Sequence, residues 1–333
     1  MFSKNLCHKH QNYIKLKVLT LTSFLFLVYF FSNNIIYAQS EQKHTPDYLI
    51  PIGNVLQIDA ELETIIVRNS VENSPFQVGD SVLKIKDEPI KSYADFSKTL
   101  YTLGENEMVS VLINRGGQNL TLTCNKEILE KINFNNLLSG FATLTYINPE
   151  TSEFGAVGHP INIGTSKKIS IKNGSISTTT DLNIQKSCKG NVGCISARRI
   201  ETIGQFNKNT SFGIKGYINN FDTTNLKKYK VASLNEVKPG RAEIILQGTN
   251  GKCEKYEIEI IAIENQRTPE SKTFKLRIVD KDLLIRTGGI VQGMSGTPIV
   301  QNDKIIGAVS HAVENDPTLC YGVYIKWMLE NNK

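Results

Sequence analysis

The chain has 333 residues, a length typical of two folded domains. With 40% hydrophobic and 21% charged residues, its composition is that of an ordinary globular protein, and 24 glycines and 10 prolines are too few for a collagen-like or Pro/Gly-rich disordered chain. The formal net charge is +6, but four of the 38 basic residues lie in residues 1–38, where there is no carboxylate, which leaves 34 basic against 32 acidic residues. A body this close to neutral argues against a nucleic-acid partner.

The N-terminal residues predict export. Lysines precede an apolar run from Val18 to Phe31, and the small residue Ala38 precedes a polar stretch, a pattern typical of a secretory signal. The run is shorter than the roughly 20 residues of a spanning helix, but it approaches that length when residues 35–38 are counted. The sequence leaves open whether residues 1–38 are a cleaved signal peptide or a membrane anchor. Residues 39–46 are polar and predict a linker.

The cysteines and histidines do not predict a metal site. Six cysteines are too few and too scattered for a disulfide framework, although Cys188 and Cys194 flank a short loop and could close a small ring, a pairing that the sequence leaves open. There is no Cys-x-x-Cys, and beyond the leader the only histidines are His44, His159 and His311. We therefore expect neither metal nor cofactor.

Residues 47–125 predict a small α+β domain. An apolar helical pattern spans residues 92–103, between short strand-like runs at 64–68, 81–85, 108–114 and 120–123. With the turn Val78-Gly79-Asp80, this order resembles a PDZ domain. Such a domain could bind a peptide as an added strand, and its ligand-binding loop would correspond to Asn54, Val55, Leu56 and Gln57. A rigid spacer without a ligand is the alternative.

Residues 128–333 are nearly all of β character. Strand-like runs bounded by Gly, Asn, Asp or Lys occur at 142–147, 169–171, 256–263 and 274–279. Roughly 200 residues of short strands are typical of a closed β-barrel or a pair of barrels.

The strongest signal for catalysis is a serine between glycines, in Gly293-Met294-Ser295-Gly296. Gly293 lets the backbone bend so that its N–H and that of Ser295 point at one oxyanion. A nucleophilic serine needs a base, normally histidine. His159 stands far enough before Ser295 to lie on the other half of a double barrel, and spacing does not exclude His311. A tight Gly-Ser turn without catalysis is the alternative.

Three segments resemble the serine endopeptidase family of stage IV sporulation protein B from endospore-forming bacteria. They are the run from Phe154 to His159, the run from Thr287 to Pro298, and residues 315–318, together with the preceding PDZ-like domain. The resemblance implies a mostly β protein with an N-terminal membrane or signal helix, a PDZ-like domain and a chymotrypsin-like double β-barrel.

The resemblance also implies a biological role. Such proteins are exported across the forespore membrane into the intermembrane space, where they are membrane-anchored or secreted after cleavage. They cleave themselves and cut a membrane-tethered sporulation regulator, which triggers intramembrane proteolysis of a late mother-cell pro-sigma factor. The expected partners are therefore a protein substrate, the protein itself and the membrane.

Carried over to this sequence, the resemblance makes Ser295 the nucleophile, His159 the base and Asp280 the acid that orients it, with Gly293 and Ser295 as oxyanion donors. Asp280 stands close before Ser295, whereas Asp181 and Asp222 fit the usual chymotrypsin-like interval better. A non-catalytic PDZ/β-barrel signalling adaptor is the alternative function. The presence of both Ser and His in matching motifs favours the enzyme.

Overall fold

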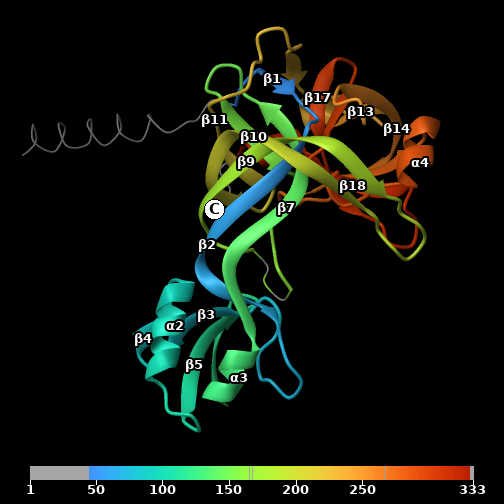
Figure 1. Ribbon diagram of the computed structural model, residues 1–333. Coiled ribbons are helices and arrows are strands. Elements are labelled where there is room, and N and C mark those ends of the chain that lie inside the picture. Colours follow the sequence, from blue (N-terminus) through green and yellow to red (C-terminus); the bar gives the residue numbers. More distant parts are fainter. Residues whose placement is uncertain (1–44, 165, 167, 267, 331–333) are drawn as a thin grey trace, which may run out of the picture. The chain divides into compact units, whose positions relative to one another are not determined.

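The computed structural model describes residues 45–330 except 165, 167 and 267. The predicted signal or anchor at 1–38, nearly all of the predicted linker and His44 lie outside this part of the chain. Within it, no helix is long and apolar enough to cross a membrane. The described residues are mostly β-strands (Figure 1).

Six antiparallel strands close a first barrel. Around the ring, each strand pairs with the next and the last pairs with the first, in the order β7 (Asn133–Ile147), β2 (Val55–Asn69), β9 (Ile171–Gln185), β10 (Cys194–Thr210), β11 (Gly213–Ile218) and β8 (Glu153–Val157). Alternate apolar side chains of these strands fill the interior, among them Leu56, Ile58, Leu144, Ile176 and Ile214.

Six further antiparallel strands close a second barrel. The order is β13 (Gly240–Gln247), β14 (Cys253–Ile263), β15 (Phe274–Ile278), β18 (Leu319–Tyr324), β17 (Lys304–Ala312) and β16 (Pro298–Gln301), which returns to β13. Its core includes Phe274, Leu276, Ile299, Ile305 and Val323. The strand pairings thus form the two barrels that the resemblance implies.

Short elements connect the barrels. The strand β1 (Tyr48–Pro51) pairs with β12 (Tyr229–Val231) through its first half and with β7 through its second half, and β12 pairs with β17. The remaining short helices here are η1 (Leu234–Glu236), α4 (Lys281–Thr287) and α5 (Ile325–Leu329). Lys215 of β11 is 4% exposed and donates to the carbonyls of Leu329 (2.9 Å) and Glu330 (2.8 Å), which fixes the end of α5 to the first barrel.

The PDZ-like domain has a core of its own, which runs from Ile65 to Phe134. It contains β3 (Ser81–Ile85), β4 (Glu88–Pro89), α2 (Tyr93–Thr102), β5 (Met108–Arg115), β6 (Gln118–Asn125) and α3 (Lys126–Lys131). The fully buried Asp80 of the Val-Gly-Asp turn receives two hydrogen bonds from Arg115, at 2.8 and 2.7 Å. This bidentate pair explains why an acid follows the glycine of the turn.

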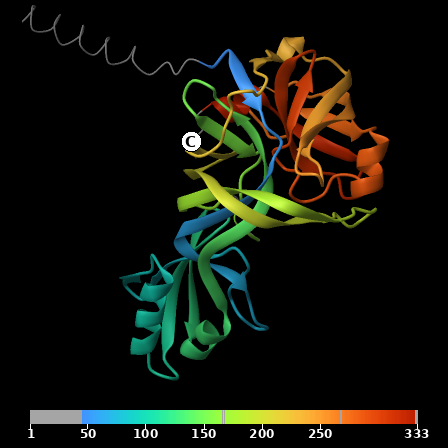
Figure 2. The same cartoon turned by 45° about the horizontal axis from the view of Figure 1, so that its top comes forward.

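This domain is inserted into the first barrel. Residues 55–61 of β2 pair with β7 inside the barrel, and after a register shift residues 66–69 of β2 pair with residues 133–135 of β7 in the PDZ-like domain. Figures 1 and 2 show both strands continuing from one domain into the other. The structure therefore draws the boundary differently from the predicted 47–125 and 128–333, because residues 48–62 pair within the peptidase sheets.

Candidate active site

Ser295 lies in the turn that leads into β16, and two buried threonines of β7 hold this turn. Thr143 donates its backbone N–H to the carbonyl of Ser295 (2.8 Å) and its hydroxyl to the carbonyl of Gly293 (2.8 Å). The hydroxyl of Thr145 donates to the carbonyl of Gly296 at 2.6 Å. Both threonines are 0% exposed. The first barrel thus positions a loop that belongs to the second.

Gly296 is needed for this close approach. Its φ is +95°, and a Cβ atom would lie 2.3 Å from the carbonyl oxygen of Thr143 and 2.4 Å from the nitrogen of Val157. No side chain fits between these backbones, so the glycine after Ser295 serves the contact between the loop and β7 and β8.

His159 is carried by a tight turn at the end of β8. Val157 and Gly158 both have positive φ, 77° and 76°, and a β-branched residue in this region is a strained exception. A Cβ atom at Gly158 would lie 2.8 Å from the carbonyl oxygen of Val309. The turn brings Nε2 of His159 to 3.0 Å from Oγ of Ser295.

The other ring nitrogen of His159 fixes the tautomer. Nδ1 lies 2.9 Å from the carbonyl oxygen of Pro160. Because a carbonyl only accepts, Nδ1 carries the hydrogen, and Nε2 is left to accept the hydroxyl hydrogen of Ser295. Burial lowers the pKa of His159 below its ordinary value, although the Pro160 carbonyl opposes the shift. The imidazole is therefore neutral at pH 7, as a general base must be.

Two backbone N–H groups beside Ser295 are free. In the part of the chain that the structure describes, the N–H groups of Gly293 and Ser295 donate to no protein acceptor, whereas those of Met294 and Gly296 bind the carbonyls of Val291 (3.1 Å) and Val309 (2.8 Å). Gly293 has a φ of +104°, which other residues seldom adopt. Unpaired donors on both sides of Met294 are what an oxyanion hole requires.

Asp280 does not orient His159, and the prediction of this role is wrong. Asp280 is the N-cap of α4, where its carboxylate accepts the backbone N–H groups of Leu283 (2.9 Å) and Glu257 (3.3 Å). The Pro160 carbonyl occupies the position at Nδ1 of His159 that the acid was expected to take. Capping a helix satisfies this carboxylate within its own barrel.

The other candidate acids are also engaged elsewhere. Asp181 forms an exposed ion pair with Arg198 (2.8 Å), and Asp222 accepts from Thr224 (2.6 Å). Among the described residues, no carboxylate is hydrogen-bonded to His159. The site is therefore a Ser–His pair oriented by a backbone carbonyl.

His311 packs beside this pair. Its ring centroid lies 5.1 Å from that of His159, and its Nδ1 is buried without a hydrogen-bond partner in the described part of the chain. Burial, followed by repulsion from His159 and Lys272, lowers the pKa of His311 to about 4. His311 is thus a neutral neighbour of His159, and it is His159 that reaches Ser295.

The predicted PDZ ligand loop is also wrong. Val55 and Leu56 are fully buried at the start of β2, which pairs with β7 on one side and β9 on the other. Asn54 and the N–H of Val55 donate to the side chain of Gln247 in β13 (3.3 and 2.9 Å). With both strand edges occupied, these residues have no edge to offer a peptide.

Comparison with known proteins identifies the family. The sequence profile of SpoIVB peptidase S55 matches residues 132–329, which is more than half of the chain. The chain belongs to this family. It is a serine peptidase, and a PDZ domain profile matches residues 42–125. No curated protein matches the chain.

Among solved structures, this S55 peptidase is similar to an inactive serine-to-alanine mutant of Rv3671c from M. tuberculosis H37Rv. The sequence identity is 10%, the alignment covers 57% of this chain and 80% of that one, and the TM-score is 0.30.

Two supports of the S55 site were not among the predicted site residues. The first is the pair Thr143 and Thr145. The sequence signal for it is that these threonines alternate with apolar residues in a predicted strand. The second is the loop between Cys188 and Cys194, whose thiols are free in the structure. Just before this loop, the hydroxyl of Ser187 donates to the carbonyl of Ile290 (2.5 Å). Within the loop, the carbonyl of Gly193 accepts the N–H of Gln292 (2.7 Å). This loop supports the segment before Ser295.

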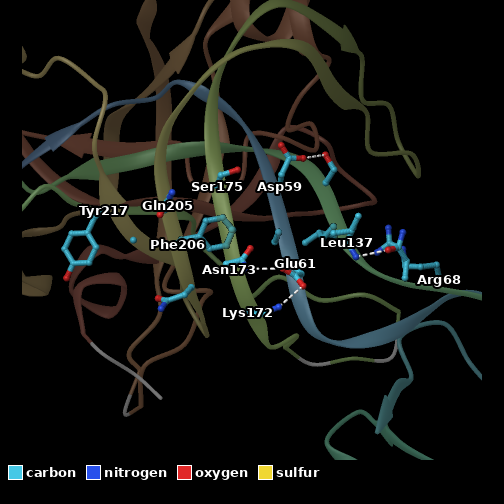
Figure 3. A pocket seen from close by; sticks show the side chains of 17 residues that line it. Asp59, Glu61, Arg68, Leu137, Lys172, Asn173, Ser175, Gln205, Phe206 and Tyr217 are labelled. Atoms are coloured by element: carbon cyan, nitrogen blue, oxygen red, sulfur yellow. Dashed lines mark hydrogen bonds and ion pairs between the residues drawn. The ribbon is translucent and has the colours of Figure 1, made fainter. Parts of the chain in front are cut away.

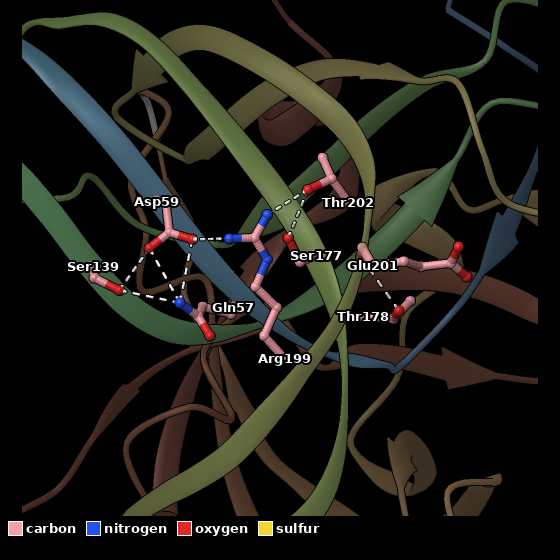
Figure 4. Close-up of polar contacts among 8 residues, drawn as sticks. All are labelled: Gln57, Asp59, Ser139, Ser177, Thr178, Arg199, Glu201 and Thr202. Carbon is pink, nitrogen blue, oxygen red and sulfur yellow. Dashed lines mark hydrogen bonds and ion pairs between the residues drawn. The ribbon is translucent and has the colours of Figure 1, made fainter.

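A pocket of about 1040 Å³ lies away from Ser295 and His159 in the S55 peptidase (Figure 3). Its Glu61 accepts from Lys172 (3.0 Å) and Asn173 (3.1 Å). At its border, Asp59 accepts from Ser139 (2.7 Å) and faces Arg199 (Figure 4). Neither Ser295 nor His159 lines this pocket, and the charges of Glu61 and Asp59 are compensated within the protein.

No cluster of three or more His, Cys, Asp or Glu side chains that could hold a metal ion occurs among the described residues.

Proposed function

We propose that the protein hydrolyses peptide bonds by acyl transfer through Ser295. His159 takes the hydroxyl proton as Oγ attacks the substrate carbonyl, and the N–H groups of Gly293 and Ser295 bind the oxyanion that forms. His159 then gives the proton to the leaving amine, and water releases the acyl group by the same route in reverse. The observation that carries this proposal is the 3.0 Å contact between Nε2 of His159 and Oγ of Ser295.

In this mechanism the Pro160 carbonyl replaces a carboxylate. It holds the imidazole in the tautomer that accepts from Ser295, and its partial negative charge favours the imidazolium that forms during attack. A carbonyl dipole stabilises that cation less than the full negative charge of a carboxylate does.

We further propose the biological role that the family membership supports. In this proposal the protein is exported across the forespore membrane, cleaves itself, and cuts a membrane-tethered sporulation regulator to trigger intramembrane proteolysis of a late pro-sigma factor. The apolar N-terminal run supports export, and the S55 match supports sporulation. The adaptor function is not favoured, because an adaptor has no use for a base aligned on a serine.

Self-cleavage tests catalysis by Ser295 and the proposed cleavage of the protein by itself. The purified full-length chain is incubated beside Ser295→Ala, and the intact masses are followed over time. The exposed Ser110 of β5 provides a matched control, Ser110→Ala. We expect wild type and Ser110→Ala to shorten at defined positions while Ser295→Ala stays whole. Equal shortening of all three would contradict catalysis by Ser295.

A further inference from the structure

A small pocket opens directly beside Ser295 and His159. Its volume is about 340 Å³, and its apolar walls come from Ile58, Leu138, Phe141, Ala142, Val157 and Ile161. Among the described residues, the side chains lining it that are not apolar are those of Ser295, His159, Asn162 and Gln292, and none of the described lining residues is an Asp, Glu, Lys or Arg. An apolar surface of this kind favours an apolar occupant.

The walls are held by packing from behind. Ile58, Ala142 and Val157 are 3–4% exposed and form the floor. Leu138 and Ile161 pack against the core of the first barrel, and Phe141 packs against the core of the second. Because both cores fix the walls, the pocket is already formed before substrate binds.

The position of His159 decides which part of a substrate reaches the pocket. His159 must give its proton to the leaving amine, so the chain beyond the scissile bond lies on the imidazole side of Ser295. The pocket is on this side: most of its wall comes from β2, β7 and the segment around His159, and the second barrel contributes Gln292, Gly293 and Ser295.

We propose that this pocket binds the side chain of the residue that follows the scissile bond and selects a large apolar residue there. The inference rests on the proposed function of Ser295 and names its substrate class: bonds followed by Leu, Ile, Val, Met or Phe. A charged side chain would lose its hydration without gaining a counter-ion. We expect a preference on the order of tenfold or more in kcat/KM over charged residues.

The test begins with the wild-type cleavage profile. The full-length enzyme digests a peptide library derived from a proteome, and the new N-termini are sequenced by mass spectrometry. We expect large apolar residues at the first position of the new N-termini. A uniform distribution there, or enrichment of Asp, Glu, Lys or Arg, overturns the inference.

Two variants change the pocket in opposite ways. Leu138→Asp places a carboxylate in the wall and shifts the preference towards Lys and Arg. A Cβ atom at Gly140 meets no atom within 4 Å, so Gly140→Leu fits the strand, fills the pocket and shifts the preference towards Gly, Ala and Ser. Leu137 is 60% exposed and does not line this pocket, so Leu137→Asp is the matched control and keeps the wild-type profile.

Acyl transfer to added amines tests the assigned side without any variant. The enzyme reacts with a peptide ester to form an acyl-enzyme in the presence of leucinamide or lysinamide. Each amine competes with water for the acyl group, and the new peptide amide is quantified. We expect leucinamide to be used on the order of tenfold better. Equal use overturns the inference.

Labelling of the serine separates this inference from the proposed function. A fluorophosphonate forms a Ser–O–P bond and releases fluoride without needing a residue in the pocket. A labelled Ser295 with a uniform cleavage profile overturns only the pocket inference. Absence of both labelling and cleavage overturns the proposed function, and the pocket inference with it.

Discussion

At the scale of single residues, the orienting contact of His159 sets the site apart from a Ser-His-Asp triad. The Pro160 carbonyl lies 2.9 Å from Nδ1, while Asp280 caps α4. The sequence contains a signal for the cap, because an acid followed by a short apolar helix is typical of an N-cap. The motif resemblance that predicts a catalytic role for Asp280 does not take its position as the N-cap of α4 into account.

Asp280→Ala separates the two roles. We expect the free energy of unfolding to fall by about 1 kcal/mol because a cap is lost, while kcat stays within a few-fold of wild type. A triad acid would lose about 10⁴-fold in kcat on removal. Urea unfolding and peptide hydrolysis measure the two quantities, with the exposed Asp282→Ala as the control. A loss in kcat near 10⁴-fold would restore Asp280 to the mechanism.

The pH dependence of activity follows from His159. Burial lowers its pKa below the ordinary value of 6.5, and only the neutral imidazole accepts from Ser295. We therefore expect kcat/KM to be constant at neutral pH and to fall as pH drops through a value below 6.5, since kcat/KM reports the free enzyme. An acid limb centred above pH 7 would show that the imidazolium is stabilised, as by a carboxylate.

The stability of the protein in acid depends on His311. Its pKa is about 4 in the folded state, against 6.5 for an unperturbed histidine. Between these values the unfolded chain binds a proton that the folded chain does not, so the free energy of unfolding falls as pH is lowered from 6.5 towards 4. The groups facing His311 are His159 and Lys272. His311→Phe should flatten this dependence in urea titrations, and an unchanged slope would contradict the assignment.

At the scale of elements, two hydroxyl groups of β7 in the first barrel hold the Gly293–Gly296 turn, which contains Ser295. Thr143 and Thr145 each donate to a carbonyl of the Gly293–Gly296 turn. In a Val variant a buried carbonyl loses its partner, which costs about 1 kcal/mol or more.

Thr143→Val should therefore lower kcat with little change in KM, because the Gly293 N–H would no longer be held in place for the oxyanion. The nearly isosteric Thr178→Val on β9 is the control, since its hydroxyl makes only an exposed 3.4 Å contact with the carbonyl of Glu201. Steady-state kinetics on a peptide substrate measure both. A rise in KM at constant kcat would show that Thr143 acts on substrate binding instead.

Local patterns predicted many elements but not their partners. The Val-Gly-Asp turn, the helix after Ser92 and the hairpin around Gly116 follow from turn chemistry and periodicity, and all three occur. The position of residues 55–61 just before the PDZ-like pattern predicts that they belong to that domain. Their partners in β7 and β9 lie about 80 to 120 residues away, and no local pattern encodes that pairing.

At the scale of the whole molecule, the PDZ-like domain is an insertion between two strands that are already paired. In the barrel, Ala60 pairs with Leu138 and Glu61 with Leu137. Replacement of residues 63–135 by a short turn should therefore leave a β-hairpin that still closes the barrel. We expect this shortened protein to fold and its Ser295 to react with a fluorophosphonate.

The matched control keeps the insertion but damages it. Asp80→Ala removes the fully buried partner of Arg115, which is itself 22% exposed and keeps its hydrogen bond to the Pro75 carbonyl. The loss should cost about 1–3 kcal/mol within the PDZ-like domain, and labelling of Ser295 should continue. Loss of labelling in both proteins, with the barrel still folded by circular dichroism, would mean that the PDZ-like domain is required to form the site.

The central claim is that Ser295 and His159 act as one catalytic unit. The direct measurement is kcat/KM for the full-length wild type, Ser295→Ala, His159→Gln and the double variant on one peptide substrate. We predict that each single variant loses about 10⁴-fold or more, and that the double variant loses no more than the worse single one, because either change disables the same step. Losses that multiply in the double variant, or an active His159→Gln, would contradict the account.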